Sequence, residues 1–215
     1  KAPFSPIDVI EEYTRPARLF ENGKIVTKDP LTDREIIKFD TNEDLEAFNT
    51  DGLRSLLFTM SHVPNMKEKT LRYPGHAERI QLIKDIGLFS PKEVSIKNNK
   101  IKPIDVTSHL LEKEWQLEEN EEEFTTMKII LNSSKISYEV HLYDEYDHIN
   151  NITSMARTTG YTCTAGASLL TKKIFTEQGI FTPELIGKET ACYNFILEYL
   201  KERGIVLKTK EINSI

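Results

Sequence analysis

The sequence predicts an α+β fold with a mixed, largely antiparallel sheet covered by helices. Hairpin signals such as Asn22-Gly23 separate short β-forming runs, single amphipathic helices lie between these runs, and a strict alternation of strands and helices is absent. The 215 residues can bury a substantial core without disulfides, and we expect one domain over residues 1–215.

The first elements are predicted from their boundary residues. Ser5-Pro6 predicts a helix over 6–14, because proline is tolerated in the first turn and the serine hydroxyl is available as an N-cap. Asn22-Gly23 accepts the positive φ angles of a type I′ turn and therefore predicts a hairpin. A strand is expected over 34–40.

The segment 66–76, MKEKTLRYPGH, places a dense polar set beside a turn. If 68–72 is a strand, Glu68 and Arg72 lie on the same face. Isoleucines at helical spacing follow, so Arg72 and His76 lie where a strand leads into a helix. Such junctions favour anions. From physical chemistry alone, the alternative that Arg72 only pairs with a surface carboxylate is equally open.

The second half combines a long hairpin with helices. Two β-rich runs joined by the polar turn NSSK predict the hairpin, with one face packed and the other exposed. The other predicted elements are a helix at 103–115, a small polar segment at 154–170 that becomes a helix fading at Gln178-Gly179, a helix at 188–203 and an edge strand at 205–212.

Composition argues against several classes of protein. The net charge is −6, no basic stripe is visible, and the acidic run at 112–123 is interpreted as a solvated loop, so nucleic acid is not an expected partner. Cys163 and Cys192 form no CxxC pair, which fits a reducing cytosol. Because no apolar run approaches the length of a membrane span, we expect a cytoplasmic protein without a membrane partner.

Cofactor and metal motifs are also missing. The sequence contains no G-x-G-x-x-G and no P-loop, so no cofactor-binding residues are predicted. Asp144, Glu145, Asp147 and His148 cluster in sequence, but a strand end brings only alternate residues together, and no metal site is expected. Cys163 has no histidine next to it in sequence and is interpreted as a buried or helix-lining thiol in a small-residue turn.

The segment SMARTTG leaves two interpretations open. Its two hydroxyls, Thr158 and Thr159, and its arginine stand next to a glycine at the mouth of a helix, where they could hold a carboxylate or a phosphate. The same residues could instead form an elaborate N-cap.

Three sets of motifs agree with one family. SPIDVIEEYTRPARLFENGK, NTDGLRSLL with EKTLRYPGH, and YDHINNITSMARTTG resemble the C-terminal, substrate-side region of the saccharopine dehydrogenase family, which includes lysine 6-dehydrogenase and carboxynorspermidine dehydrogenase-like enzymes. The resemblance implies an α+β substrate and dimerisation domain that follows a Rossmann domain binding NAD or NADP. It also implies hydride transfer at the C–N carbon of an amino-acid-derived amine.

The resemblance also implies substrate-side residues. These are Arg72 with Leu71 and Tyr73, Thr158 and Thr159, the polar turn Asn49, Thr50, Asp51 and Gly52 as wall or support, and His76. An arginine fork suits an amino-acid carboxylate in bidentate geometry. No catalytic residue is assigned, because the family places acid or base groups on the Rossmann side as well.

The expected function is therefore the substrate-binding and dimerising part of an oxidoreductase, silent without its Rossmann domain, which this chain lacks. The chain begins at Lys1 without methionine, which fits an excised domain. Probable edge strands predict a homodimer. The alternative is a stand-alone binding or scaffold module that kept the fold and lost catalysis.

Overall fold

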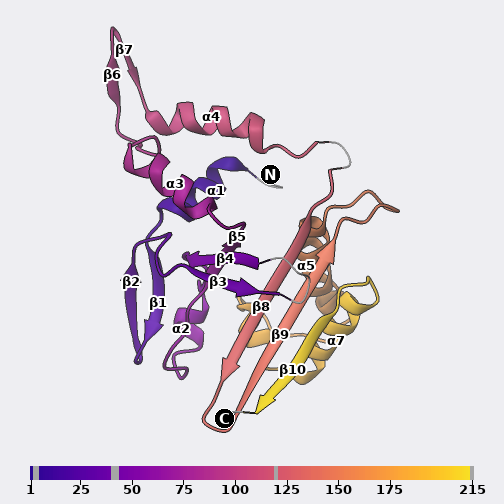
Figure 1. The fold of residues 1–215 in the computed structure, drawn as a ribbon. Coiled ribbons are helices and arrows are strands. Elements are labelled where there is room, and N and C mark those ends of the chain that lie inside the picture. Colours follow the sequence, from indigo (N-terminus) through magenta and orange to yellow (C-terminus); the bar gives the residue numbers. More distant parts are fainter. Residues whose placement is uncertain (2–4, 40–43, 119–120, 214–215) are drawn as a thin grey trace. The chain divides into compact units, whose positions relative to one another are not determined.

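A computed structural model describes residues 1, 5–39, 44–118 and 121–213. Within this part of the chain, helices and antiparallel sheets follow one another without regular alternation, which confirms the α+β class. The chain divides into two compact units, Lys1–Leu117 and Glu118–Ile215. Each unit has its own helices and strands (Figure 1).

The first unit contains three separate antiparallel sheets. Its elements are α1 (Pro6–Thr14), β1 (Ala17–Glu21), β2 (Lys24–Lys28), β3 (Glu35–Lys38), β4 (Asp44–Asn49), α2 (Leu56–Thr59), β5 (Lys69–Arg72), α3 (His76–Asp85), β6 (Val94–Ile96), β7 (Asn99–Ile101) and α4 (Pro103–Trp115). β1 pairs with β2, β4 lies between β3 and β5, and β6 pairs with β7.

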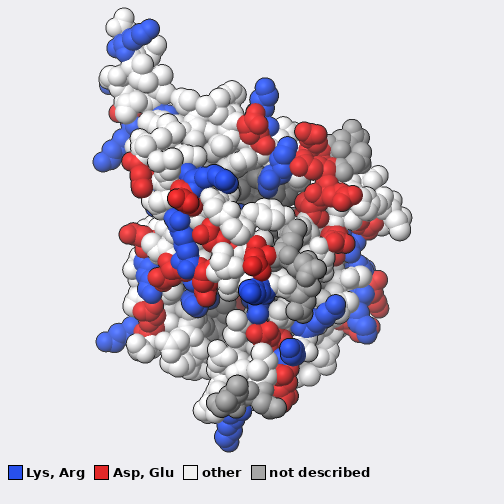
Figure 2. All heavy atoms as spheres, in the orientation of Figure 1, with Lys and Arg blue, Asp and Glu red and all other residues white. Residues whose placement is uncertain are grey.

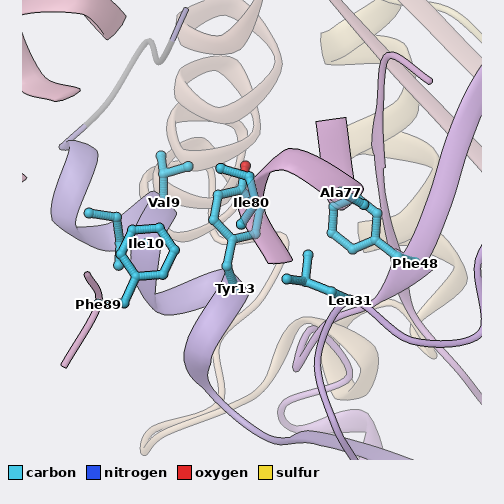
Figure 3. Close-up of a cluster of buried hydrophobic side chains, with 8 residues drawn as sticks. All are labelled: Val9, Ile10, Tyr13, Leu31, Phe48, Ala77, Ile80 and Phe89. Carbon is cyan, nitrogen blue, oxygen red and sulfur yellow. The ribbon is translucent and has the colours of Figure 1, made fainter. Parts of the chain in front are cut away.

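The core of the first unit forms around one face of α1. Val9, Ile10 and Tyr13 of α1 are at most 5% exposed. Figure 3 shows the cluster that they build with residues from other elements, namely Leu31, Phe48, Ala77, Ile80 and Phe89. Burial of one such large apolar side chain contributes roughly 1.5–3 kcal/mol. The cluster therefore fixes α1 against β4 and α3.

Most predicted boundaries in this unit are confirmed. α1 spans Pro6–Thr14, although the Ser5 side chain makes no capping hydrogen bond with a described residue. Asn22 and Gly23 have φ angles of 50° and 76°, as the predicted turn between β1 and β2 requires. The predicted isoleucine stripe is partly wrong, because α3 ends at Asp85 and leaves Ile86 64% exposed.

The register of β4 and β5 decides which side chains share a face. Glu46 pairs with Arg72, and Phe48 pairs with Thr70. Directly paired side chains point to the same side of a sheet, so Thr70 and Arg72 lie on the face that carries Phe48. Since the Tyr13 ring lies 6.2 Å from the Phe48 ring, tilted by 55°, this is the face toward α1. Leu71 points to the other face.

The hairpin β6–β7 is an element that the sequence analysis did not predict. It projects from the ends of α3 and α4 (Figure 1), and basic side chains gather at its tip (Figure 2). Its strands are three residues each, and only Ile101 is partly buried. Lys97 has the positive φ of 57° in the turn, a conformation that glycine or asparagine usually signals.

The second unit is one three-stranded sheet with helices. Its elements are β8 (Phe124–Asn132), β9 (Ile136–Glu145), α5 (Ser154–Thr171), α6 (Pro183–Ile186), α7 (Thr190–Lys201) and β10 (Leu207–Asn213). The predicted hairpin is confirmed as β8–β9, and β10 pairs antiparallel with the other side of β9. β10 is thus an edge strand, as predicted. The homodimer inferred from such edges stays a prediction.

The packed face of this sheet carries the core of the second unit. Leu142 of β9, Leu200 of α7 and Ile205 form the buried cluster, each at most 7% exposed. Asp144, two residues along the same face of β9, is 6% exposed. These values confirm the prediction that one side of the hairpin is packed.

Helix α5 corrects the prediction for SMARTTG. The helix already begins at Ser154, so this segment is the helix itself, and it ends at Thr171, before Gln178-Gly179. Its threonine hydroxyls donate to carbonyl oxygens one turn earlier, which satisfies these polar groups within the helix. Cys163 is therefore an exposed helical residue, not part of a turn.

The acidic run is also only partly a loop. α4 continues through Glu112 to Trp115, so the start of the run is helical. The Glu123 carboxylate accepts a hydrogen bond from the Ser154 N–H at the start of α5. Burial raises the pKa of Glu123. Glu123 thus caps a helix, and the interpretation of the whole run as a solvated loop is wrong at this end.

Candidate functional site

The polar turn after β4 is buried. Asn49, Thr50 and Asp51 are 0%, 3% and 6% exposed. Buried polar groups need hydrogen-bond partners, and among these side chains only Asn49 Oδ1 lacks one within the described residues. The Asn49 amide donates to Thr32 Oγ1 at 3.1 Å and to Asp33 Oδ2 at 2.9 Å. The turn is therefore a fixed wall.

Asp51 is held by Arg18 of β1. Arg18 donates from Nε to Oδ1 at 2.9 Å and from Nη2 to Oδ2 at 2.8 Å, and its backbone N–H donates to Oδ1 at 3.1 Å. These hydrogen bonds lower the pKa of the Asp51 carboxyl. Because both carboxylate oxygens are engaged, Asp51 supports the turn, and its place at a substrate site stays a prediction.

Thr50 connects the turn to the strand that follows it in the sheet. Its hydroxyl donates to Glu68 Oε2 at 2.6 Å and lies 2.8 Å from the Thr70 hydroxyl oxygen. Glu68 also accepts a hydrogen bond from the Gly52 N–H. Burial is the main cause that raises the pKa of Glu68. A side chain at Gly52 would overlap Glu68, so glycine is needed there for Glu68 to reach the turn.

Arg72 is held at the α1 side of the sheet. It donates from Nη2 to Glu12 Oε2 at 3.0 Å, from Nε to the Tyr13 hydroxyl at 3.2 Å and from Nη1 to the Leu71 carbonyl at 2.8 Å. Its side chain remains 31% exposed. Burial raises the pKa of Glu12, and Arg72 opposes this shift. A guanidinium has five N–H donors, so two remain beyond these three bonds.

His76 extends this chain of hydrogen bonds. Its Nε2 lies 3.0 Å from the Tyr13 hydroxyl. Because Arg72 donates to the Tyr13 oxygen, we assign the Tyr13 proton to the bond with Nε2, which requires a neutral imidazole. Burial, followed by the charge of Arg72, lowers the pKa of His76 to about 4. His76 is therefore uncharged near neutral pH.

A pocket of about 360 Å³ lies beside these residues in the first unit. Its lining combines carboxylates, arginines and small polar groups, namely Asp8, Glu11, Glu12, Arg15, Thr50, Asp51, Gly52, Arg54, Glu68 and Thr70. Arg72 does not line the pocket itself, but it donates a hydrogen bond to Glu12, which does. Arg54 has a positive φ of 47°, a conformation that costs free energy in a non-glycine residue and often marks functional sites.

The predicted residues are thus only partly brought together. Thr50 and Asp51 line the pocket, whereas Arg72 and His76 do not line it and are linked to each other through Tyr13. Leu71 points to the opposite face of the sheet, and Tyr73 is 58% exposed. The expectation that Leu71 and Tyr73 contact substrate stays a prediction.

Thr158 and Thr159 belong to the second unit. Their hydroxyls donate to the carbonyls of Ser154 and Met155, at 2.9 and 2.5 Å. Thr153 provides the N-cap of α5, since its Oγ1 accepts from the Ala156 N–H. Of the two interpretations of SMARTTG, the helix N-cap is therefore present, but it is formed by Thr153, the residue before this segment. The expectation that Thr158 and Thr159 share a cleft with Arg72 stays a prediction.

Arg157 of the same motif has a structural role. It donates from Nε to Asp144 Oδ2 at 3.0 Å, from Nη1 to Asp147 Oδ2 at 2.8 Å and from Nη2 to the Arg203 carbonyl at 3.0 Å. Both aspartates of the acidic cluster at the end of β9 are thus occupied by one arginine. This pairing ties the start of α5 to β9 and to the end of α7.

Sequence reasoning missed Glu12, Arg54 and Glu68 as pocket residues. Glu68 had a usable signal, because it alternates with Arg72 on one face of the predicted strand. Glu12 and Arg54 had none, since they reach the site from a helix and a loop that only the tertiary fold brings together.

The part of the chain that the structure describes contains neither a membrane-spanning helix nor a cluster of metal ligands. In residues 1, 5–39, 44–118 and 121–213, no helix is both long and apolar enough to cross a membrane. In the same ranges, no three or more His, Cys, Asp or Glu side chains are arranged to hold a metal ion.

The first unit thus has a charged pocket within the size range of small-molecule sites. The chain belongs to the saccharopine dehydrogenase C-terminal domain family, whose model matches residues 1–205. Its structure is similar to apo histidine-tagged saccharopine dehydrogenase (L-Glu forming) from Saccharomyces cerevisiae, with a TM-score of 0.75 and 18% sequence identity. The match covers 99% of this chain and 62% of that protein's chain, so this chain spans less than two thirds of it.

Proposed function

We propose that this chain is the substrate-binding and dimerising part of a cytoplasmic NAD(P)-dependent oxidoreductase that acts on the C–N bond of an amino-acid-derived amine, of the saccharopine or lysine type. Membership of the saccharopine dehydrogenase C-terminal domain family over residues 1–205 is the observation that carries the proposal. On this proposal, the family domain spans both units, and the chain is inactive without a cofactor-binding domain.

The residues of the chain do not fit a dinucleotide cofactor. The turn from β5 to α3 contains a single glycine, Gly75. A dinucleotide-binding fingerprint has three glycines at such a turn. Glu78 lies in the first turn of α3, where its charge opposes a pyrophosphate. We therefore assign no residue of this chain to NAD(P).

The proposed role of Arg72 is to bind a substrate carboxylate. Its two remaining N–H donors and its 31% exposure are compatible with a ligand, and Glu12 and Tyr13 hold the guanidinium in one orientation. Charged hydrogen bonds of this kind contribute about 1.5–3 kcal/mol each. Thr158, Thr159, Leu71, Tyr73 and His76 remain part of the proposed substrate side.

Arg72→Ala tests this role in the complete protein that contains the chain. We expect saccharopine binding, measured by calorimetry, to weaken about 10- to 100-fold, because charged hydrogen bonds are lost. The control is Arg79→Ala, which removes an exposed arginine of α3 and should leave binding unchanged. If Arg72→Ala binds like the wild type with an intact fold, Arg72 has only a structural role.

A non-catalytic binding or scaffold module with the same fold is the second candidate. The observation that favours it is that the Glu12 carboxylate already occupies Arg72 where a substrate carboxylate would bind. The coding sequence upstream of Lys1 separates the two candidates, because the enzyme requires a G-x-G-x-x-G segment there. An initiator methionine in its place would favour the scaffold.

A further inference from the structure

Glu68 differs from the other carboxylates around the pocket. Glu11 pairs with Arg15, Glu12 with Arg72, and Asp51 with Arg18. Glu68 is half-buried and forms no ion pair with any residue that the structure describes. Asp8 also lines the pocket, but it is an exposed residue in the first turn of α1.

The position of the Glu68 carboxylate is fixed by neutral groups. The Thr50 hydroxyl donates to it at 2.6 Å, and the Gly52 N–H donates to it as well. The Thr70 hydroxyl oxygen lies 2.8 Å from the Thr50 hydroxyl oxygen and forms a hydrogen bond with it. The absence of a side chain at Gly52 makes the space that Glu68 occupies. Neutral donors orient the carboxylate without an ion pair, and the charge of Arg54 acts on it only at longer range.

A half-buried carboxylate that lines a pocket without an ion-pair partner favours a cationic ligand group. Removal of an ionised carboxylate from water costs free energy, and a cation that forms charged hydrogen bonds offsets this cost. Arg54, which has Asp51 as its ion-pair partner at 3.9 Å, lies at the same pocket and can meet a ligand carboxylate. The pocket thus offers both charges to a zwitterionic molecule.

We propose that Glu68 is a specificity-determining residue that binds a protonated aliphatic amine of the ligand. This inference rests on the proposed function and adds to it the group that recognises the amine. Thr50 and Gly52 act as positioning residues, because they hold the carboxylate toward the pocket.

The test is calorimetric titration of the complete protein with L-lysine and with glutarate, which has carboxylates but no amine. Wild-type protein should bind L-lysine and not glutarate. Glu68→Gln keeps the size and an acceptor oxygen but removes the charge, and should weaken L-lysine binding about 10- to 100-fold. The matched control is Glu35→Gln, whose carboxylate pairs with Lys69 outside the pocket and whose loss should leave binding unchanged.

Several outcomes would overturn the assignment. One is unchanged L-lysine binding by a folded Glu68→Gln protein. Equal binding of glutarate and L-lysine by the wild type is another, and it needs no variant. Saturable binding of Mg²⁺ that Glu68→Gln abolishes, with no L-lysine binding, would assign the carboxylate to a metal.

Failure of this inference is distinguishable from failure of the proposed function. If Glu68→Gln retains saccharopine binding while Arg72→Ala loses it, the function stands and the role of Glu68 is refuted. If wild-type protein binds neither saccharopine nor L-lysine, the proposed function itself fails.

Discussion

His76 shows how one side chain makes the stability of the first unit depend on pH. Its pKa is about 4 in the folded protein, below the ordinary value of 6.5, because the ring is buried and lies near Arg72. Between these two values the unfolded chain binds a proton that the folded chain does not. This contribution therefore destabilises the fold as pH falls from 6.5 toward 4.

We expect the urea midpoint of unfolding to be lower at pH 5 than at pH 7.5, and His76→Gln to reduce this difference. The matched control is His62→Gln, since His62 is exposed and its replacement should leave the pH dependence unchanged. An equal pH dependence in the wild type and in His76→Gln would contradict the neutral, half-buried state of His76.

At the residue scale, the sequence predicted which side chains share a face of a strand better than it predicted which residues those side chains contact. Alternation along the predicted strand 68–72 correctly placed Thr70 and Arg72 on one face, because the geometry of a strand is local, although β5 begins at Lys69 and Glu68 precedes it. The partners Glu12 and Tyr13 lie 60 and 59 positions away in sequence, and only the packing of α1 on the sheet brings them to Arg72. No pattern within 66–76 contains that information.

At the scale of elements, α5 depends on one arginine. The Arg157 side chain is 11% exposed, and that of its partner Asp144 is 5% exposed. Removal of one partner from a buried ion pair costs about 3–5 kcal/mol, because the remaining charge stays buried. Arg157→Met keeps most of the aliphatic chain and leaves Asp144 and Asp147 without this partner.

We therefore expect Arg157→Met to speed hydrogen exchange of the α5 amides, measured by mass spectrometry, by an amount that corresponds to about 3–5 kcal/mol. The control is Lys201→Met, which removes an exposed lysine from a pair whose side chains are 65% and 63% exposed. It should change stability by less than about 0.5 kcal/mol. Equal effects of both variants would refute the structural role of Arg157.

Elements with local signals were predicted well. Proline at the first turn located α1 and α4, and Asn22-Gly23 located the β1–β2 hairpin. The hairpin β6–β7 was missed because Lys97 adopts the positive φ in its turn. The start of α5 was missed because threonines and glycines have low helix propensity, which tertiary contacts such as those of Arg157 outweigh.

At the scale of the whole molecule, the fold class and the family were predictable, but the arrangement of the site was not. Family motifs extend over most of the sequence, and the family match over residues 1–205 agrees with them. The pocket depends on long-range contacts between α1, the Thr50–Gly52 turn and Glu68, and Glu12 and Arg54 reach it without any local sequence signal. The predicted substrate contacts of Thr158 and Thr159 remain untested, because these residues belong to the second unit and the pocket belongs to the first.

The central claim is that this chain binds the substrate of a saccharopine dehydrogenase-like oxidoreductase. Its most direct test is the rate of NAD(P)H formation by the complete protein with saccharopine, for the wild type and for Arg72→Ala. We expect saccharopine-dependent turnover in the wild type and a substantial loss of kcat/KM in the variant, while the fold is retained. No turnover with either NAD or NADP in a folded complete protein would contradict it.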